Sequence, residues 1–161
     1  MSAYTLRHHD GVLVMITRRN LLALAWYDAP RPGHLLSVLR VVEDLHRVHG
    51  KYGLLDVVVR GTPSFPEQVR DEGKRLIEGT SGWGGVTAHI IEVEGFAGTA
   101  TRMFLSTMML MGRGRGADAR VFATHPDGCA WLARVLSRAG NEWTPQELET
   151  AYRELRAIEP R

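Results

Sequence analysis

Short apolar runs at the start of the chain have the pattern of a β-hairpin. Residues 11–17 (GVLVMIT) and 21–27 (LLALAWY) are almost entirely apolar, and the polar tripeptide Arg18-Arg19-Asn20 separates them. Two such runs around a short polar break are typical of paired antiparallel strands. Asparagine also tolerates the positive φ that a tight turn often requires. We therefore expect the chain to open with a hairpin.

Beyond a break rich in Pro and Gly, stretches with helical spacing alternate with short aliphatic runs. Between residues 34 and 49, apolar side chains recur three and four positions apart, which predicts an amphipathic helix that ends at Gly50. Residues 54–59 form an aliphatic run around one acid, Asp56, as in a strand that lies inside a sheet. The other elements that the pattern predicts are strands at 86–93 and 119–123 and helices at 64–78, 98–111, 124–139 and 144–157.

Three of these helices begin with a hydroxyl residue that is followed by an acid three positions later. In this arrangement the hydroxyl accepts a hydrogen bond from a free backbone N–H of the first turn, and a Glu can return one to the cap residue. The pairs are Ser64 with Glu67, Thr124 with Asp127, and Thr144 with Glu147.

The order of the elements predicts an α/β fold made of one domain. An opening hairpin followed by alternating helices and strands indicates a mixed five-stranded sheet, antiparallel at one edge and parallel elsewhere, with flanking helices. A length of 161 residues suits a single domain that spans the whole chain. We expect the core at about 10–136. A C-terminal helical extension at about 141–158 packs either on the domain or on a partner.

Composition and charge exclude several classes of protein. Cys129 is the only cysteine, so no disulfide can form within the chain, and a reducing cytoplasm is the simplest setting. A net charge of +2, with its arginines scattered, disfavours nucleic-acid binding. The longest apolar stretch, 104–111, is too short to span a bilayer, and polar residues after position 6 argue against a signal peptide.

The segment 120–132 (RVFATHPDGCAWL), together with the element order, resembles the STAS-like domains of bacterial signalling proteins, in the group similar to antagonists of anti-sigma factors. The resemblance covers roughly residues 10–136. It implies a non-enzymatic signalling or scaffold module that binds a protein partner, either a regulator or a kinase. In the antagonist branch a Ser or Thr before the second helix is phosphorylated, usually after an Asp.

The corresponding stretch here is Arg60-Gly61-Thr62-Pro63-Ser64-Phe65, which lacks the Asp-Ser pair. The resemblance therefore implies Ser64, and secondarily Thr62, as phospho-acceptors. Arg60 is close enough in sequence to pair with a phosphate. The alternative interpretation of Ser64 is a helix cap and nothing more.

Methionines crowd the helix predicted at 98–111, which is apolar around much of its girth. Such a helix belongs to a core or to an interface, and methionine adapts to varied partners. The helix is therefore a candidate surface for self-association or partner docking, together with a tryptophan in a glycine-rich loop. These candidate interface residues are Met103, Met108, Met109, Met111 and Trp83.

The sequence contains no motif that indicates a reaction, a metal or a cofactor. His8 and His9 are adjacent, and neighbours in a strand point to opposite faces, so they cannot easily bind one ion. Cys129 sits in the first turn of a predicted helix, four residues after His125, but a buried, packed cysteine is the simpler interpretation. We expect no enzyme activity, no metal and no cofactor. A small-molecule or lipid-binding domain, or an enzyme whose site is assembled from loops, remain the alternatives.

Overall fold

The computed structural model describes residues 4–61, 64–112, 118–138, 140 and 142–161. They form one six-stranded mixed sheet whose strands lie in chain order, from β1 at one edge to β6 at the other. The first three strands are antiparallel neighbours, and β3 to β6 run parallel. The strands are β1 (Thr5–His9), β2 (Leu13–Arg18), β3 (Leu21–Trp26), β4 (Gly53–Val58), β5 (Val86–Ile91) and β6 (Asp118–Phe122).

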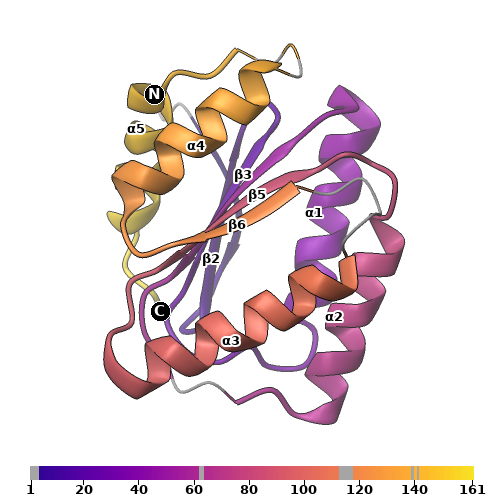
Figure 1. The fold of residues 1–161 in the computed structure, drawn as a ribbon, viewed down its shortest axis with the longest axis vertical. Helices are drawn as coiled ribbons and strands as arrows, with labels where there is room; N and C mark the ends of the chain where they lie inside the picture. The colour runs from indigo at the N-terminus through magenta and orange to yellow at the C-terminus, as the bar shows by residue number, and fades with distance from the viewer. Residues whose placement is uncertain (1–3, 62–63, 113–117, 139, 141) are drawn as a thin grey trace.

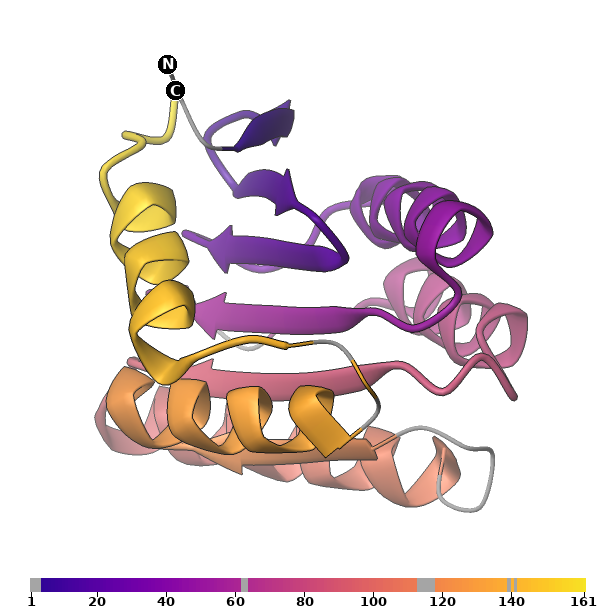
Figure 2. The same cartoon turned by 90° about the horizontal axis from the view of Figure 1, so that it is seen from above.

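Within the described residues, five helices cover both faces of the sheet. Crossovers between parallel strands are right-handed, and all three advance in one direction across the sheet, so their helices lie on the same face. Figures 1 and 2 show α1, α2 and α3 on that face and α4 and α5 on the other. The helices are α1 (His34–His49), α2 (Glu67–Gly79), α3 (Gly95–Gly112), α4 (His125–Arg138) and α5 (Pro145–Arg156).

The sheet separates two hydrophobic cores. On one face, side chains such as Ile16 pack with Leu132 of α4 and Leu148 of α5. On the other face, side chains such as Met15 pack beneath Val42 of α1. Because β2 and β3 are covered on both faces, every position can be apolar, which explains their unbroken apolar runs. The mixed α/β class and the β2–β3 hairpin are confirmed.

The prediction of five strands was wrong, because β1 adds a sixth. Its sequence, Thr5-Leu6-Arg7-His8-His9, has no apolar alternation, and its residues are exposed or only half-buried. β1 lies at the sheet edge and pairs with β2, with an irregularity in the register between Leu6 and His8. A polar edge strand is held by backbone hydrogen bonds, so the hydrophobic pattern does not reveal it. In the hairpin turn, Arg19 rather than Asn20 takes the positive φ, at 51°.

Of the expected caps, the one at Thr144 is confirmed and the one at Ser64 is wrong. Thr144 accepts a hydrogen bond from Glu147 N, and the Glu147 side chain accepts one from Thr144 N. α2 instead begins at Glu67, after Pro66, without a side-chain cap. Pro66 disfavours helical geometry in the residue before it, so the helix cannot extend back to Ser64, which is exposed.

The C-terminal helix α5 packs on the domain. Leu148, Ala151 and Leu155 are buried in the same core as β2 and β3. The chain end then reaches the turn between β1 and β2, where Arg161 N donates to Asp10 O. Across the described residues, no helix has both the length and the apolar character that a membrane span needs.

Candidate functional site

Three buried polar residues lie on the face of the sheet that α1 and α2 cover. Asp56 of β4, Glu72 of α2 and His34 of α1 are 8%, 5% and 8% exposed. Carboxylates are rarely buried without partners, because losing water costs several kcal/mol per ion. Each of these buried groups therefore needs hydrogen-bond partners.

Asp56 lies in the middle of β4 and is bound by side chains from both neighbouring strands. Trp26 Nε1 of β3 donates to Oδ1 across 2.9 Å, and His89 Nδ1 of β5 lies 2.5 Å from Oδ2. His89 is the residue paired with Asp56 in the parallel register. The sheet register thus aligns donor, carboxylate and imidazole across three adjacent strands.

The contact with Asp56 determines which nitrogen of the His89 ring carries the proton. An ionised carboxylate can only accept hydrogen bonds, so Nδ1 of His89 carries the proton. In the neutral ring, Nε2 is then an acceptor. None of the described residues hydrogen-bonds to Nε2, and 15% of the side chain is exposed. The ring therefore presents a hydrogen-bond acceptor fixed by a buried acid.

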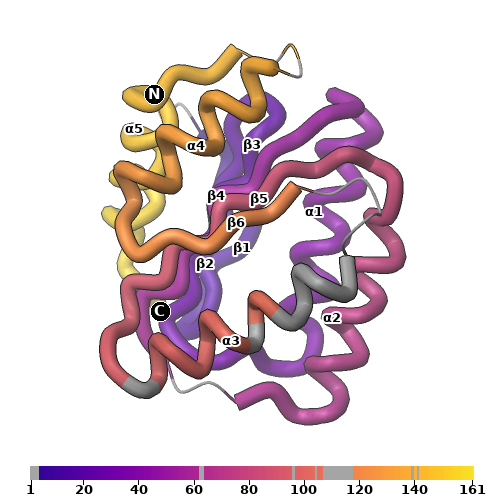
Figure 3. Tube along the Cα trace, viewed as in Figure 1, coloured from indigo at the N-terminus to yellow at the C-terminus, as the bar shows by residue number. Residues whose placement is uncertain are grey.

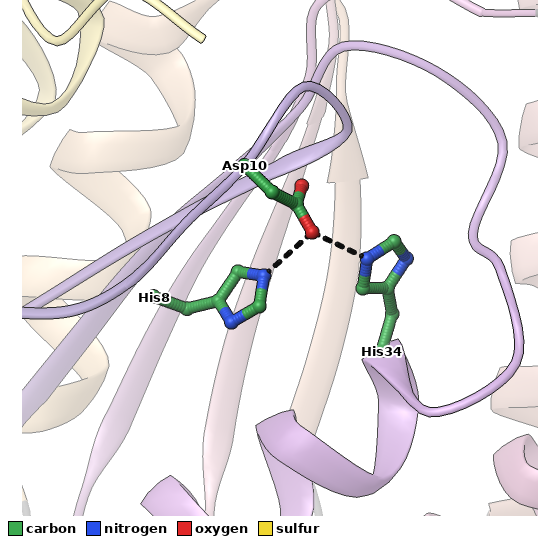
Figure 4. A group of neighbouring side chains, drawn as sticks. All are labelled: His8, Asp10 and His34. Carbon is green, nitrogen blue, oxygen red and sulfur yellow. Dashed lines mark hydrogen bonds and ion pairs between the residues drawn. The ribbon is translucent and has the colours of Figure 1, made fainter. Parts of the chain in front are cut away.

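A second carboxylate, Asp10, lies between two imidazole rings in the turn from β1 to β2 (Figure 4). Its Oδ2 is 2.9 Å from Nε2 of His8 and 2.9 Å from Nε2 of His34. Its Oδ1 accepts the backbone N–H groups of Val12 and Leu13. Partial burial raises the pKa of the Asp10 carboxyl. The two backbone and two imidazole hydrogen bonds outweigh that effect and hold the pKa well below its usual range.

Trp26 connects the two carboxylate groups. Its indole donates to Asp56, and its ring meets His34 edge-on, with 6.0 Å between the centroids. Glu72 reaches the same region from α2: its Oε1 accepts Gly33 N–H at 2.7 Å, beside His34. Its Oε2 is buried and has no hydrogen-bond partner among the described residues. We call this group the sheet-face polar cluster; its members are His8, Asp10, Trp26, His34, Asp56, Glu72 and His89.

His8, Asp10 and His34 could hold a metal ion by distance alone, since one ligand atom from each lies within 4.8 Å of the others. The hydrogen bonding of His34 opposes this role. A histidine that binds metal through Nε2 normally donates its Nδ1–H to an acceptor. Here Nδ1 faces a donor, the backbone N–H of Arg31, at 3.0 Å. The described geometry therefore fits a hydrogen-bonded carboxylate better than a metal centre.

The sequence prediction considered His8 and Asp56 without recognising their partners. His8 and His9 do diverge, since His9 contacts Glu159 O instead of Asp10. His34 is 24 residues from Asp10 in the chain, and it joins the cluster because α1 begins over this end of the hairpin. The sequence did contain one signal for this pair: Asp56 is the single acid in one aliphatic strand, and His89 is the single histidine in the next.

The predicted phospho-site residues are not brought together by any described contact. Ser64 is exposed, and Thr62 lies outside the described residues. Arg60 donates from Nε to Tyr27 O at 3.2 Å, and its guanidinium lies 5.3 Å from the centre of the Tyr27 ring. The described contacts of Arg60 thus bind it to the end of β3.

The predicted interface residues differ in their surroundings. Met103 on α3 is 67% exposed. The side chains of Met108, Met109 and Met111 lie outside the described part of the structure. Trp83 folds back onto the domain, where its ring stacks on His46 at 4.3 Å and packs against the core beneath α1.

Cys129 is fully buried, in agreement with the packing interpretation. Burial raises the pKa of its thiol to about 12, with a further contribution from Glu149, so the thiol stays protonated. His125 stacks on Tyr152, with 4.2 Å between the ring centres. These observations do not support a Cys–His nucleophile.

The chain matches no protein-family model, and a search of curated proteins finds no match either. The resemblance to STAS-like domains therefore stays a prediction from the sequence.

We predict that Asp10→Asn destabilises the protein at neutral pH and that the difference in stability between variant and wild type becomes smaller in acid. The pKa of Asp10 is lower in the folded chain than its unfolded value of about 3.9. Its contribution is therefore complete above that value and is lost as the pH falls through the folded pKa. Because the side chain of Asp10 is 39% exposed, we expect the substitution to lower the free energy of unfolding by about 1 kcal/mol at neutral pH. Urea unfolding of both proteins at neutral pH and at about pH 3 measures this difference.

The control is Asp71→Asn, which changes an exposed carboxylate on α2. This variant should match the wild type at both pH values. An Asp10→Asn variant as stable as the wild type at neutral pH would show that the two imidazole contacts add nothing to stability.

Proposed function

We propose that the protein binds a small polar molecule on the α1–α2 face of its sheet. In this proposal, Nε2 of His89 accepts a hydrogen bond or a proton from the ligand. The observation that carries the proposal is the pairing of His89 Nδ1 with the buried carboxylate of Asp56 at 2.5 Å.

The Asp56–His89 pair has the features that proton transfer needs. A carboxylate bound to one ring nitrogen fixes the tautomer and the ring orientation, and it stabilises the imidazolium that forms when the other nitrogen takes a proton. A histidine held in this way serves as a general base when its free nitrogen reaches the proton of a bound molecule. The same geometry thus supports either simple ligand binding or acid–base catalysis.

The energetic cost of Asp56 also supports a role beyond packing. The neighbouring positions in β4 are aliphatic, including Leu55 and Val57, which are completely buried. Replacing a buried ion pair by well-packed apolar residues is often neutral or stabilising. Packing alone therefore does not require an acid at this position, which supports a role for Asp56 in binding.

The setting that we propose for this function is the cytoplasm. Cys129 is a buried free thiol, and chains without disulfides are typical of reducing compartments.

We predict that ligands of this site lose affinity when His89 is replaced by Gln. Glutamine can still donate to Asp56, but it cannot supply a basic ring nitrogen to the ligand. The measurement is ligand-observed NMR with a library of small hydrogen-bond donors, namely phenols, alcohols and carboxamides. Fragments that bind the wild type should bind His89→Gln about tenfold more weakly.

A matched control is His49→Gln, which alters an exposed histidine at the end of α1. Its fragment binding should equal that of the wild type. Fragments that bind both variants alike, or a wild type that binds none of the library, would refute the proposal.

A second candidate function is a signalling module that binds a protein partner or a second copy of itself. The predicted interface helix α3 supports it, since methionine adapts to varied partners and Met103 on this helix is 67% exposed. Ser64 also lies exposed shortly before α2, where a phosphate near a helix start would be tolerated. The resemblance to STAS-like domains points in the same direction.

For this candidate we predict that the protein self-associates and that Met103→Lys prevents it. A lysine would place a charge in the buried interface. Light scattering across micromolar concentrations should show an oligomer for the wild type and a monomer for the variant. Val48→Lys is the control, because Val48 is also 67% exposed but lies on α1. A wild type that stays monomeric would exclude self-association.

A further inference from the structure

Two buried acids on the α1–α2 face of the sheet have no cationic partner among the described residues. Asp56 and Glu72 are 8% and 5% exposed, and none of the described lysine or arginine side chains forms an ion pair with either acid. Asp56 is bound by the Trp26 indole and the His89 ring. Glu72 is bound by the backbone N–H of Gly33. These hydrogen bonds stabilise the carboxylates, but they do not bring a positive side chain to the face.

One oxygen of Glu72 is buried without any donor. Its Oε1 accepts the Gly33 N–H at 2.7 Å, whereas its Oε2 has no hydrogen-bond partner among the described residues. Leaving a buried acceptor unpaired costs free energy. Such a group often marks a functional site or a position that a bound species completes. Oε2 of Glu72 is therefore an acceptor for which a ligand can supply the donor.

Glu72 belongs to the same polar cluster as the proposed ligand site. α2 lies beside α1 on this face (Figure 3), and Glu72 reaches from α2 to Gly33, the residue before His34. The His34 ring meets the Trp26 ring, with 6.0 Å between the centroids, and Trp26 donates to Asp56. The carboxylate charges of α2 and β4 therefore act on the same part of the sheet face.

Two unpaired polar atoms in this region are both acceptors. Nε2 of His89 lacks a donor among the described residues, because the ring proton on Nδ1 is directed to Asp56. Oε2 of Glu72 lacks a donor as well. An anion would meet lone pairs at both atoms and carboxylate charge beside them. A cation with N–H groups would instead supply donors and compensate the charge, and hydrogen bonds of this charge-assisted kind are the strong ones.

We propose that the ligand of the α1–α2 face is a small organic cation with several N–H donors, of the amine, amidine or guanidine class. One N–H donates to Nε2 of His89. Glu72 offers Oε2 to a second N–H and, together with Asp56, compensates the positive charge. This inference rests on the proposed function, because it names the class of molecule that the site binds.

Three probes of nearly identical shape test the charge of the ligand. At neutral pH benzamidine is cationic, benzamide is neutral and benzoate is anionic, and ligand-observed NMR titrations of the wild type measure the affinity of each. We expect benzamidine to bind about tenfold more tightly than benzamide, because hydrogen bonds between charged groups are stronger than neutral ones. Benzoate should bind most weakly.

The outcomes separate this inference from the proposed function. If benzamide or benzoate binds as tightly as benzamidine, the cationic class is wrong. The proposed function would survive that result as long as the neutral probe binds His89→Gln more weakly than the wild type. If none of the three probes binds at millimolar concentration, both the inference and the proposed function fail.

Glu72→Gln tests the role of Glu72, since glutamine keeps an oxygen for the Gly33 N–H but removes the charge. Benzamidine should bind this variant about tenfold more weakly than the wild type, and benzamide should bind both alike. The control is Glu78→Gln, which makes the same change at an exposed position of α2 and should bind as the wild type does.

Equal losses of benzamidine affinity in the two variants, or no loss in Glu72→Gln, would overturn the role of Glu72. Circular dichroism verifies that both variants are folded. If Glu72→Gln does not fold, the comparison of the three probes on the wild type decides the proposal, because it needs no substitution.

Discussion

The buried carboxylate of Asp56 is the constraint on which the proposed site depends. It lies in the middle of the sheet and takes its hydrogen bonds from Trp26 of β3 and His89 of β5. A slip of one residue in either strand would turn its donor to the opposite face. The buried carboxylate would then lose one of its two hydrogen-bond donors, at a cost of about 1–3 kcal/mol. The parallel register and the polar site are therefore specified together.

The strand order explains why this polar chemistry lies on one face. Because β3 to β6 follow one another in sequence, α1, α2 and α3 share a side. The other face carries α4 and α5 over an apolar core that includes Leu55, Val57 and Ile90. This face of the sheet thus carries the larger of the two apolar cores. The other combines an apolar layer beneath α1 with buried charge, and the charge requires specific partners.

Local patterns predicted those parts of the fold that local forces determine. The hairpin, the alternation of helices and strands, and the cap at Thr144 follow from hydrophobic spacing and from hydrogen bonds within a few residues. β1 was missed because an edge strand needs no apolar side chains. The cap at Ser64 failed because Pro66 sets the start of α2.

The site was harder to predict because its members are far apart in the sequence. Asp56 and His89 are separated by 33 residues and meet only through the β4–β5 register. The sequence placed each of them within a strand, but it did not give the pairing of those strands. His34 reaches Asp10 only because α1 begins above the hairpin. Such contacts depend on tertiary structure, which hydrophobic periodicity does not encode.

Nitrogen-15 NMR of the His89 ring tests most directly whether Asp56 controls this histidine. At a pH where the ring is neutral, we expect a proton on Nδ1 and none on Nε2. A ring with its proton on Nε2, or one that exchanges equally between the two tautomers, would show that Asp56 does not fix the tautomer and that Nε2 is not a fixed acceptor for a ligand.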